Sequence, residues 1–243
     1  MDNIKLEGRT IEPAYGRNIN TAPALLARYE KGEGVILSEA DIRLLGVRNF
    51  KNAPELANNY WDTSTLSATK GEDVKVILPY ETGSRELTDV AKFGLSLINS
   101  DEKLVNYGVN LDVEGRWEKL KGSGVYTLQR KGLTLDKDLT ESEAMKHELL
   151  LTKLGHPDYV NSKFARSKDE VAEIIGKTFG LGKQEHGYDT MLGQYFPSVD
   201  KKGVLRAWCV GWLGDRAGSY AGSGLGIGSG RFAFDNLGFA LLG

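Results

Sequence analysis

The strongest candidate for acid–base chemistry in this sequence is His186, which lies in a predicted loop beside Glu185 and Asp189. An imidazole close to two carboxylates can have a shifted pKa and act as a general base, and Tyr188 would lie near the same pocket. A loop histidine of this kind is more often an ordinary surface residue. The sequence therefore favours a surface position for His186.

The remaining polar motifs do not indicate a metal site or an enzyme. His147 falls on the predicted solvent-facing side of a helix and His156 at a helix end, so the histidines are not spaced as metal ligands. The acidic run LDKDLTESE, residues 135–143, lacks calcium-loop spacing and instead places negative charge at a helix start. No serine nucleophile elbow or zinc-binding helix motif occurs. We predict no metal, no cofactor and no enzyme activity.

Two glycine-containing stretches resemble phosphate-binding loops, but the residues and elements around them do not fit such a loop. GSGLGIGSG, residues 222–230, has the glycine spacing of a dinucleotide fold, which also requires a following helix and a second strand. The chain ends at Gly243, too soon for either element. IIGKT, residues 174–178, has Val171 where a phosphate-binding loop needs its first glycine, and it lies in an amphipathic helix. We predict no nucleotide site.

Composition predicts a globular protein with an ordinary core. About 40% of the 243 residues are apolar, and the net charge of -2 gives no electrostatic reason to bind nucleic acid. The single cysteine, Cys209, cannot form an internal disulfide. The first residues, MDNIKLEGRTIEP, lack the features of a classical signal peptide, and no stretch is long enough for a membrane span. We predict a soluble product without membrane insertion.

Helix start signals and alternating apolar residues indicate the elements. Helices are predicted after Thr21, Ser38, Ser84, Thr140 and Ser167, the last two with a glutamate in capping-box position. The helix after Thr140 is expected to stop at Gly155, and the one after Ser167 to meet Gly180 and Gly182. Strands are predicted at 73–80, 124–131, 203–212 and 239–243, whereas 1–20 and 50–72 look irregular. This order indicates an α+β fold with a small, mainly antiparallel sheet and two helices in its second half.

The last forty residues carry an ordered set of scaffold residues. Arg206, the segment CVGW ending at Trp212, Ala217-Gly218 and Gly238-Phe239 follow one another. This order resembles the variable region of diversity-generating retroelement target proteins, whose fold is C-type-lectin-like and akin to that of formylglycine-generating enzymes. CVGW departs from the family's Gly-Gly-Ser-Trp element, and Ala240 stands where the family usually has arginine.

The resemblance implies how the chain is organised. It covers residues 118–243, with a variable region at about 204–243, and leaves 1–117 as an accessory or oligomerisation region that could also pack into the same domain. The paired cysteines of the enzyme branch and the calcium and sugar motif of true lectins are absent from the sequence, which counts against catalysis and against metal-dependent sugar binding.

Codon chemistry supports the same resemblance. These retroelements mutate adenines, and an AAC codon altered in this way cannot become Lys, Glu, Gln, Met or Trp. None of the five occurs between Leu213 and Gly243. The alternative is a glycine-rich loop that is simply poor in long polar side chains.

The resemblance implies a protein that binds ligands through a diversified surface. The residues expected to face a protein or cell-surface ligand are Leu213, Asp215, Ser219, Tyr220, Ser223, Leu225, Ile227, Ser229, Phe232, Phe234, Asp235 and Asn236. Trp208 and Trp212 are expected beneath them as scaffold. A receptor-binding or adhesion role at a virion tail, a fibre tip or a cell surface would fit. The alternatives are an enzyme related by fold, and a structural assembly protein that oligomerises through residues 1–117.

Overall fold

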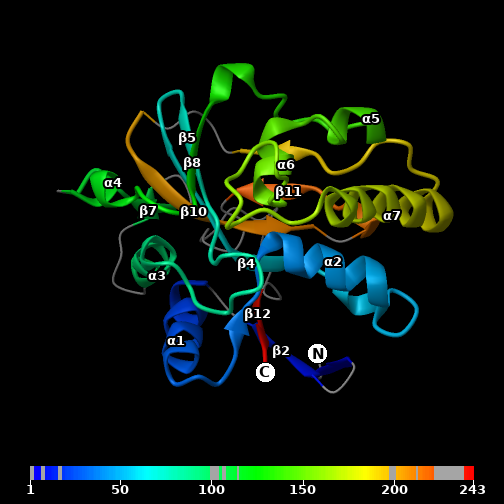
Figure 1. Ribbon diagram of the computed structural model, residues 1–243, viewed down its shortest axis with the longest axis horizontal. Coiled ribbons are helices and arrows are strands. Elements are labelled where there is room, and N and C mark those ends of the chain that lie inside the picture. The colour runs from blue at the N-terminus through cyan, green and yellow to red at the C-terminus, as the bar shows by residue number, and fades with distance from the viewer. Residues whose placement is uncertain are drawn as a thin grey trace.

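Helices surround one curved sheet (Figure 1). The computed structural model describes residues 3–6, 9–15, 18–98, 104–105, 108–113, 115–196, 201–211, 213–221 and 238–243. The strands are β1 Ile4–Leu6, β2 Arg9–Tyr15, β3 Val35–Ile36, β4 Trp61–Lys70, β5 Asp73–Ile77, β6 Leu104–Val105, β7 Gly108–Asn110, β8 Val125–Gln129, β9 Gln194–Tyr195, β10 Val204–Val210, β11 Ser219–Ala221 and β12 Gly238–Leu242. The helices are α1 Asn18–Glu30, α2 Glu39–Asn49, α3 Asp89–Ser96, α4 Arg116–Lys119, α5 Glu141–Ala144, α6 Glu148–Lys153 and α7 Lys168–His186, with short 3₁₀ turns η1 Pro54–Leu56, η2 Arg130–Gly132 and η3 Leu213–Asp215.

The sheet follows the order β1-β2-β12-β4-β10-β11-β9, with β3, β5, β6, β7 and β8 attached beside this path. Most pairs are antiparallel, as predicted, whereas β12 pairs with β4 and β11 with β9 in parallel. Strands from 1–117 and from 118–243 pair directly, since β4 lies between β12 and β10. The accessory role of the first segment stays a prediction.

The prediction that residues 50–72 are irregular is wrong for 61–70, which form the central strand β4. Its sequence, WDTSTLSATK, is rich in hydroxyl side chains, yet every residue except the last is buried. Two of the hydroxyls donate to carbonyls of other segments: Thr63 Oγ1 to the Trp208 carbonyl at 3.0 Å, and Ser64 Oγ to the Ile36 carbonyl at 2.8 Å. A strand buried on both faces shows no alternation of polar and apolar residues, so the sequence pattern does not identify it as a strand.

The expectation of an irregular arm at 1–20 is likewise wrong for β1, β2 and the start of α1. β2 pairs antiparallel with β12, for example Ile11 with Leu242, so the second and the last of the described strands lie side by side. The predicted strands 73–80, 124–131, 203–212 and 239–243 are confirmed as β5, β8, β10 and β12.

The capping signals at Ser38, Thr140 and Ser167 are confirmed, because each hydroxyl accepts a hydrogen bond from the backbone amide three residues later. Two other starts differ. α1 begins at Asn18 rather than after Thr21. α3 follows Thr88, because Ser84 accepts a hydrogen bond from the Glu86 amide in a turn ahead of the helix.

The single helix predicted from Thr140 to Gly155 is two short helices, α5 and α6, and His147 begins the second. His147 Nδ1 accepts from the Leu150 amide at 3.3 Å, while Nε2 lies 2.6 Å from the Thr134 carbonyl. The expected solvent-facing position of His147 is therefore wrong, and burial lowers the pKa of its imidazole. His156 lies just beyond α6, as predicted.

Helix α7 continues through Gly180 and Gly182 to His186. An added Cβ at Gly182 would lie 2.1 Å from the Met191 sulfur, so this glycine permits close packing inside the helix rather than ending it. The predicted loop position of His186 is wrong, since it is the last residue of α7.

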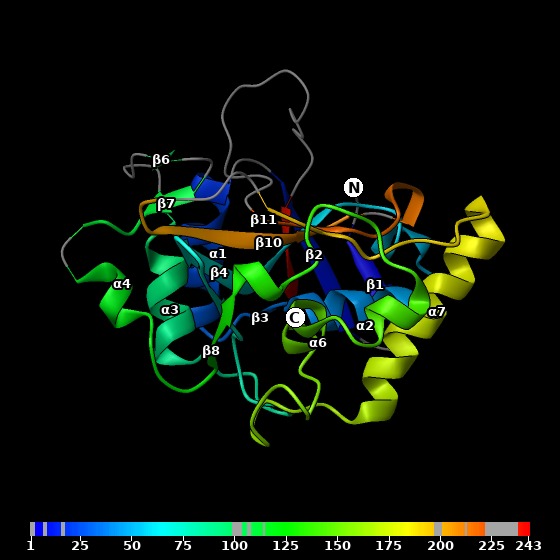
Figure 2. The same ribbon diagram turned by 90° about the horizontal axis from the view of Figure 1, so that it is seen from above.

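The core lies on either side of the central strands. Figures 1 and 2 show α1 beside α3 at one end of the sheet and α2 beside α7 at the other. The first pair packs on Leu66 and Leu205, and the second on Leu139, Leu150 and neighbouring apolar residues. Within the described part of the chain, none of the helices has the length and apolar character needed to cross a membrane.

Candidate ligand-binding surface

Four of the twelve predicted ligand-facing residues lie in the described part of the chain, namely Leu213, Asp215, Ser219 and Tyr220. The other eight lie outside the described residues, namely Ser223, Leu225, Ile227, Ser229, Phe232, Phe234, Asp235 and Asn236. Trp212, predicted as a scaffold residue, also lies outside them.

Two of the four do not have the exposed position that we predicted. Leu213 is only 2% exposed and packs with the apolar residues of α7, and Ser219 is 0% exposed because its hydroxyl lies in a buried polar cluster. Asp215 and Tyr220 are half-buried, with part of each side chain accessible. Ligand binding by these residues stays a prediction, and Asp215 and Tyr220 are the better candidates.

Three tyrosines gather beside Asp215, and we call Tyr60, Tyr195 and Tyr220 the tyrosine surface. The rings of Tyr195 on β9 and Tyr220 on β11 are stacked, with centroids 5.0 Å apart and planes at 10°. Tyr60, which precedes β4, lies 6.4 Å from Tyr220 at 57°. All three are half-buried. Tyrosines in such positions provide apolar contact area together with a polar tip, which is typical of binding surfaces.

Glycines form the floor of the tyrosine surface. A Cβ at Gly193 would lie 2.5 Å from Tyr195 Cε2 and 2.8 Å from the Lys137 carbonyl. At Gly218 it would lie 3.1 Å from the same Tyr195 atom. The backbone at these glycines therefore comes close to the tyrosine rings, in space that a side chain would fill.

This packing predicts that Gly193→Ala disturbs the surface. The added methyl group collides with both a ring and a backbone carbonyl, so we expect a loss of about 1–3 kcal/mol in the free energy of unfolding, together with a changed near-ultraviolet circular dichroism signal from the tyrosines. Gly132→Ala is the matched control, since a Cβ there meets nothing within 4 Å. Equal behaviour of the two variants in urea unfolding would show that the glycine floor is unimportant.

Two carboxylates hold the tyrosine hydroxyls. Asp215 Oδ2 accepts hydrogen bonds from the hydroxyl of Tyr60 and, at 2.9 Å, from that of Tyr220. Asp138 Oδ1 accepts from the Tyr195 hydroxyl at 2.7 Å, and its other oxygen pairs with Arg216 at 2.6 Å. Burial, followed by these carboxylates, raises the pKa of both Tyr195 and Tyr220. The hydroxyls thus stay protonated and act as donors.

The turn that leads into β11 is strained. Arg216 and Ala217 have φ of 53° and 48°, in the left-handed region that costs about 1 kcal/mol or more for a residue with a side chain. The Leu192 amide donates to the Arg216 carbonyl at 2.8 Å, and Arg43 donates to the Ala217 carbonyl at 2.9 Å. These bonds hold the turn in place.

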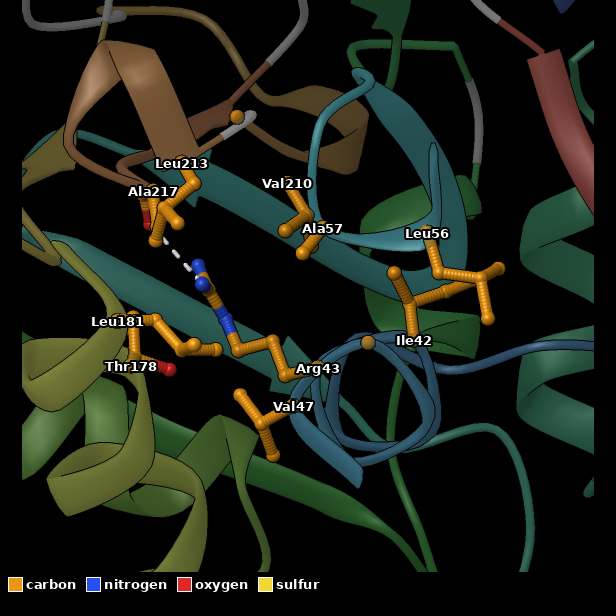
Figure 3. Close-up of a pocket in the computed structure, with 12 residues that line it drawn as sticks. Ile42, Arg43, Val47, Leu56, Ala57, Thr178, Leu181, Val210, Leu213 and Ala217 are labelled. Carbon is orange, nitrogen blue, oxygen red and sulfur yellow. Dashed lines mark hydrogen bonds between the residues drawn. The ribbon is translucent and has the colours of Figure 1, made fainter. Parts of the chain in front are cut away.

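Arg43, which donates to the Ala217 carbonyl, belongs to a buried cluster of charged residues. Glu39 and Arg43 on α2 pair at 3.0 Å, and Lys153 Nζ on α6 lies 3.0 Å from the other Glu39 oxygen, in an ion pair that is not aligned as a hydrogen bond. Ser219 completes this Glu39 cluster: its hydroxyl donates to Glu39 at 2.7 Å and accepts from Arg43 at 2.8 Å. Figure 3 shows Arg43 extending from α2 toward Ala217.

Charge in the Glu39 cluster is unbalanced, with one anion and two cations. Burial alone would raise the pKa of Glu39, but Lys153 and Arg43 outweigh burial and hold that pKa below its usual value. Burial lowers the pKa of Lys153 to about 7. Lys153 Nζ also lies 3.6 Å from the centre of the Trp208 ring, which is fully buried as we predicted for this scaffold residue.

The cavity in Figure 3 lies between α2, α7 and η3 and is lined mainly by apolar side chains. Its volume of about 20 Å³ is enough for one water molecule. This cavity is too small for a larger ligand.

The residues proposed for an enzyme site lie at the end of α7 and just after it. His186 stacks on Tyr188 with ring centroids 5.3 Å apart, whereas Asp189 pairs with Lys183 at 3.2 Å at an exposed position. Within the described ranges, no group of three His, Cys, Asp or Glu side chains is placed to hold a metal ion. Arg206, a scaffold residue in our sequence interpretation, is buried on β10 and donates to Thr69.

Comparison with solved structures defines the fold. A solved protein described as showing "accommodation of massive sequence variation in Nanoarchaeota by the C-type lectin fold" is similar to this chain, with a TM-score of 0.55 and 14% sequence identity. The similarity covers 95% of this chain and 94% of that one. This chain therefore has an α+β, C-type lectin fold, and the similarity extends well beyond residues 118–243. No protein-family model and no curated protein matches the sequence.

Proposed function

We propose that this chain is a ligand-binding protein with a diversified surface, acting as a receptor-binding or adhesion component of a virus or a cell surface. The observation that carries the proposal is the tyrosine surface, which lies on a glycine floor and directly adjoins residues 222–237 through β11. Half-exposed aromatic residues on a rigid base are suited to binding a protein ligand.

Diversification is supported by two further observations. The similar solved protein is described as accommodating massive sequence variation with the same fold. In this chain, the scaffold elements β11 and β12 bracket residues 222–237, where Lys, Glu, Gln, Met and Trp are missing from the sequence. In this proposal, the substitutions fall within residues 213–236, and Tyr60 and Tyr195, which lie outside that stretch, provide a constant part of the binding site.

The neighbouring DNA tests the diversification directly. We expect a near-copy of the end of this gene, close to a reverse transcriptase gene and differing from it at adenines. The differing codons should encode residues within 213–236. A complete flanking sequence without such a copy would contradict the proposal.

A further inference from the structure

Backbone strain gathers around β9, β11 and the turn before β11, which together we call the β9–β11 unit. Among the described residues, the non-glycine positions with a left-handed φ are Asp136, Leu192, Arg216 and Ala217. Backbone hydrogen bonds join them, because the Leu192 amide donates to the Arg216 carbonyl and the Asp136 amide to the Gln194 carbonyl, both at 2.8 Å. Such conformations cost free energy and persist only where the surrounding structure holds them. The unit therefore needs support from the residues beneath it.

The Glu39 cluster provides this support. Arg43 donates to the Ala217 carbonyl, and the Ser219 hydroxyl both donates to Glu39 and accepts from Arg43. Gln194 on β9 donates to the same hydroxyl at 3.3 Å. All of these side chains are buried. Opening of the β9–β11 unit would remove Ser219 from the cluster and admit water to the charged groups.

Lys153 is the member of the cluster that gains most from that water. Its Nζ is fully buried, makes no aligned hydrogen bond with Glu39 and lies 3.6 Å from the centre of the Trp208 ring. Two cations share one carboxylate there, so the charged amine is poorly compensated. Burial lowers the pKa of Lys153 to about 7, from the ordinary value of 10.5. Between these two pH values, an opening that hydrates Lys153 takes up a proton.

The other titratable groups near Lys153 change charge outside this window. From α2, Glu39 and Arg43 act on Lys153, and the contacts from β9, β10 and β11 are uncharged. Lys153 acts in turn on His147 at the start of α6, where burial lowers the pKa of the imidazole. Despite burial, Lys153 and Arg43 hold the pKa of Glu39 below its usual value. Burial raises the pKa of both stacked tyrosines above 10. Among these groups, Lys153 is the one that titrates just above pH 7.

We infer that the β9–β11 unit opens and closes with the uptake and release of one proton at Lys153. The charged amine favours the open form, and the neutral amine favours the closed form. This inference rests on the proposed function only in treating the unit as part of the binding site. It makes that site sensitive to pH near neutrality, so a ligand that needs the closed unit would bind more tightly as the pH rises above 7.

Hydrogen exchange in the full chain tests the inference at the Ser219 amide, which donates to the Gly193 carbonyl at 2.8 Å. Protection of this amide, relative to an unstructured peptide at the same pH, should rise by up to about tenfold per pH unit between pH 7 and 9. The exchange should depend little on urea at low concentration, because the opening is local and exposes little surface.

Lys153→Met is the decisive variant, because it removes the titrating amine and keeps a side chain of similar length. The rise in Ser219 protection should disappear in this variant. Lys177→Met is the matched control, since it makes the same substitution at an exposed position on α7, where the side chain is 52% accessible. The rise should persist there.

A second measurement does not depend on the stability of any variant. The carbon signal of Lys153 Cε, followed by nuclear magnetic resonance in the parent protein, should titrate with a midpoint near pH 7. A midpoint near 10.5 would show that the buried amine keeps its proton and would overturn the inference.

Three exchange results would also overturn it: Ser219 protection that is constant between pH 7 and 9, an equal rise in the parent and in Lys153→Met, or exchange that follows global unfolding at every urea concentration. These failures can be told apart from failure of the proposed function. A DNA copy differing at adenines, combined with constant protection, would retain the proposed function and reject the proton-linked opening. A missing copy would reject diversification whatever the protection shows.

Discussion

Replacing Glu39 by glutamine is expected to destabilise the protein by about 3–5 kcal/mol, the range seen when one partner of a buried ion pair is removed. Glu39 is the sole anion of the Glu39 cluster, and its side chain is 0% exposed. Its loss would leave Arg43 and Lys153 buried together without a counter-charge. It would also weaken the support for the strained turn at Ala217, which Arg43 holds through the backbone carbonyl.

Removing a cation from the same cluster should have a much smaller effect. Lys153→Met leaves Glu39 paired with Arg43 and Ser219, so the remaining charges are balanced. Methionine is close to lysine in length and packs well against an aromatic ring such as that of Trp208. We expect a change below about 1.5 kcal/mol, in line with apolar replacements of buried charges.

Urea unfolding of both variants at pH 7 provides the comparison. Glu185→Gln, at an exposed position on α7, controls for the loss of one negative charge. An equal cost for Glu39→Gln and Lys153→Met would contradict the assignment of Glu39 as the essential counter-charge.

The pH dependence of stability follows from the same cluster. Burial lowers the pKa of Lys153 to about 7, whereas the unfolded chain keeps the ordinary value of 10.5. Between these values the unfolded state binds more protons, so the unfolding free energy should rise as the pH increases from 7 toward 10.5. Lys153→Met removes this titration, and its stability should be less dependent on pH in that window.

Local signals explain which parts of the fold could be predicted from the sequence. The starts of α2, α5 and α7 were predictable because a serine or threonine binds the amide three residues later, which is a purely local interaction. Strand β4 was missed because Thr63 and Ser64 donate to carbonyls of distant segments, those of Trp208 and Ile36. The split at His147 depends likewise on a contact with Thr134, outside the helix.

The candidate site was only partly predictable. Tyr220 and Asp215 lie in the stretch that resembles a variable region, so the resemblance found them. Tyr60 and Tyr195 joined them only in the fold, because β4, β9 and β11 come from distant parts of the chain. Gly193 and Gly218, each close in sequence to a tyrosine of the stacked pair, were a sequence signal for this site. The signal is not specific, because many glycines in this chain form turns instead. Leu213 and Ser219 are buried rather than exposed as we predicted, because composition does not distinguish the two faces of a short strand or turn.

The sharpest expected contrast is between the segment 222–237 and the strand β10. If the surface is built to vary, substitutions in the segment should leave the fold intact, because the buried cluster and Trp208 lie beneath the neighbouring strands. Every residue of β10 is buried, so random substitutions there should remove core contacts or bury unpaired polar groups.

The central claim is tested most directly by measuring the folded fraction of two libraries, displayed on cells and challenged with protease. One library randomises the eight predicted site residues between 223 and 236, and the other randomises the seven residues of β10. We predict that most members of the first library resist protease as the parent does, and that almost none of the second do. Similarly low resistant fractions in both libraries would contradict a stable C-type lectin scaffold that carries a replaceable binding surface.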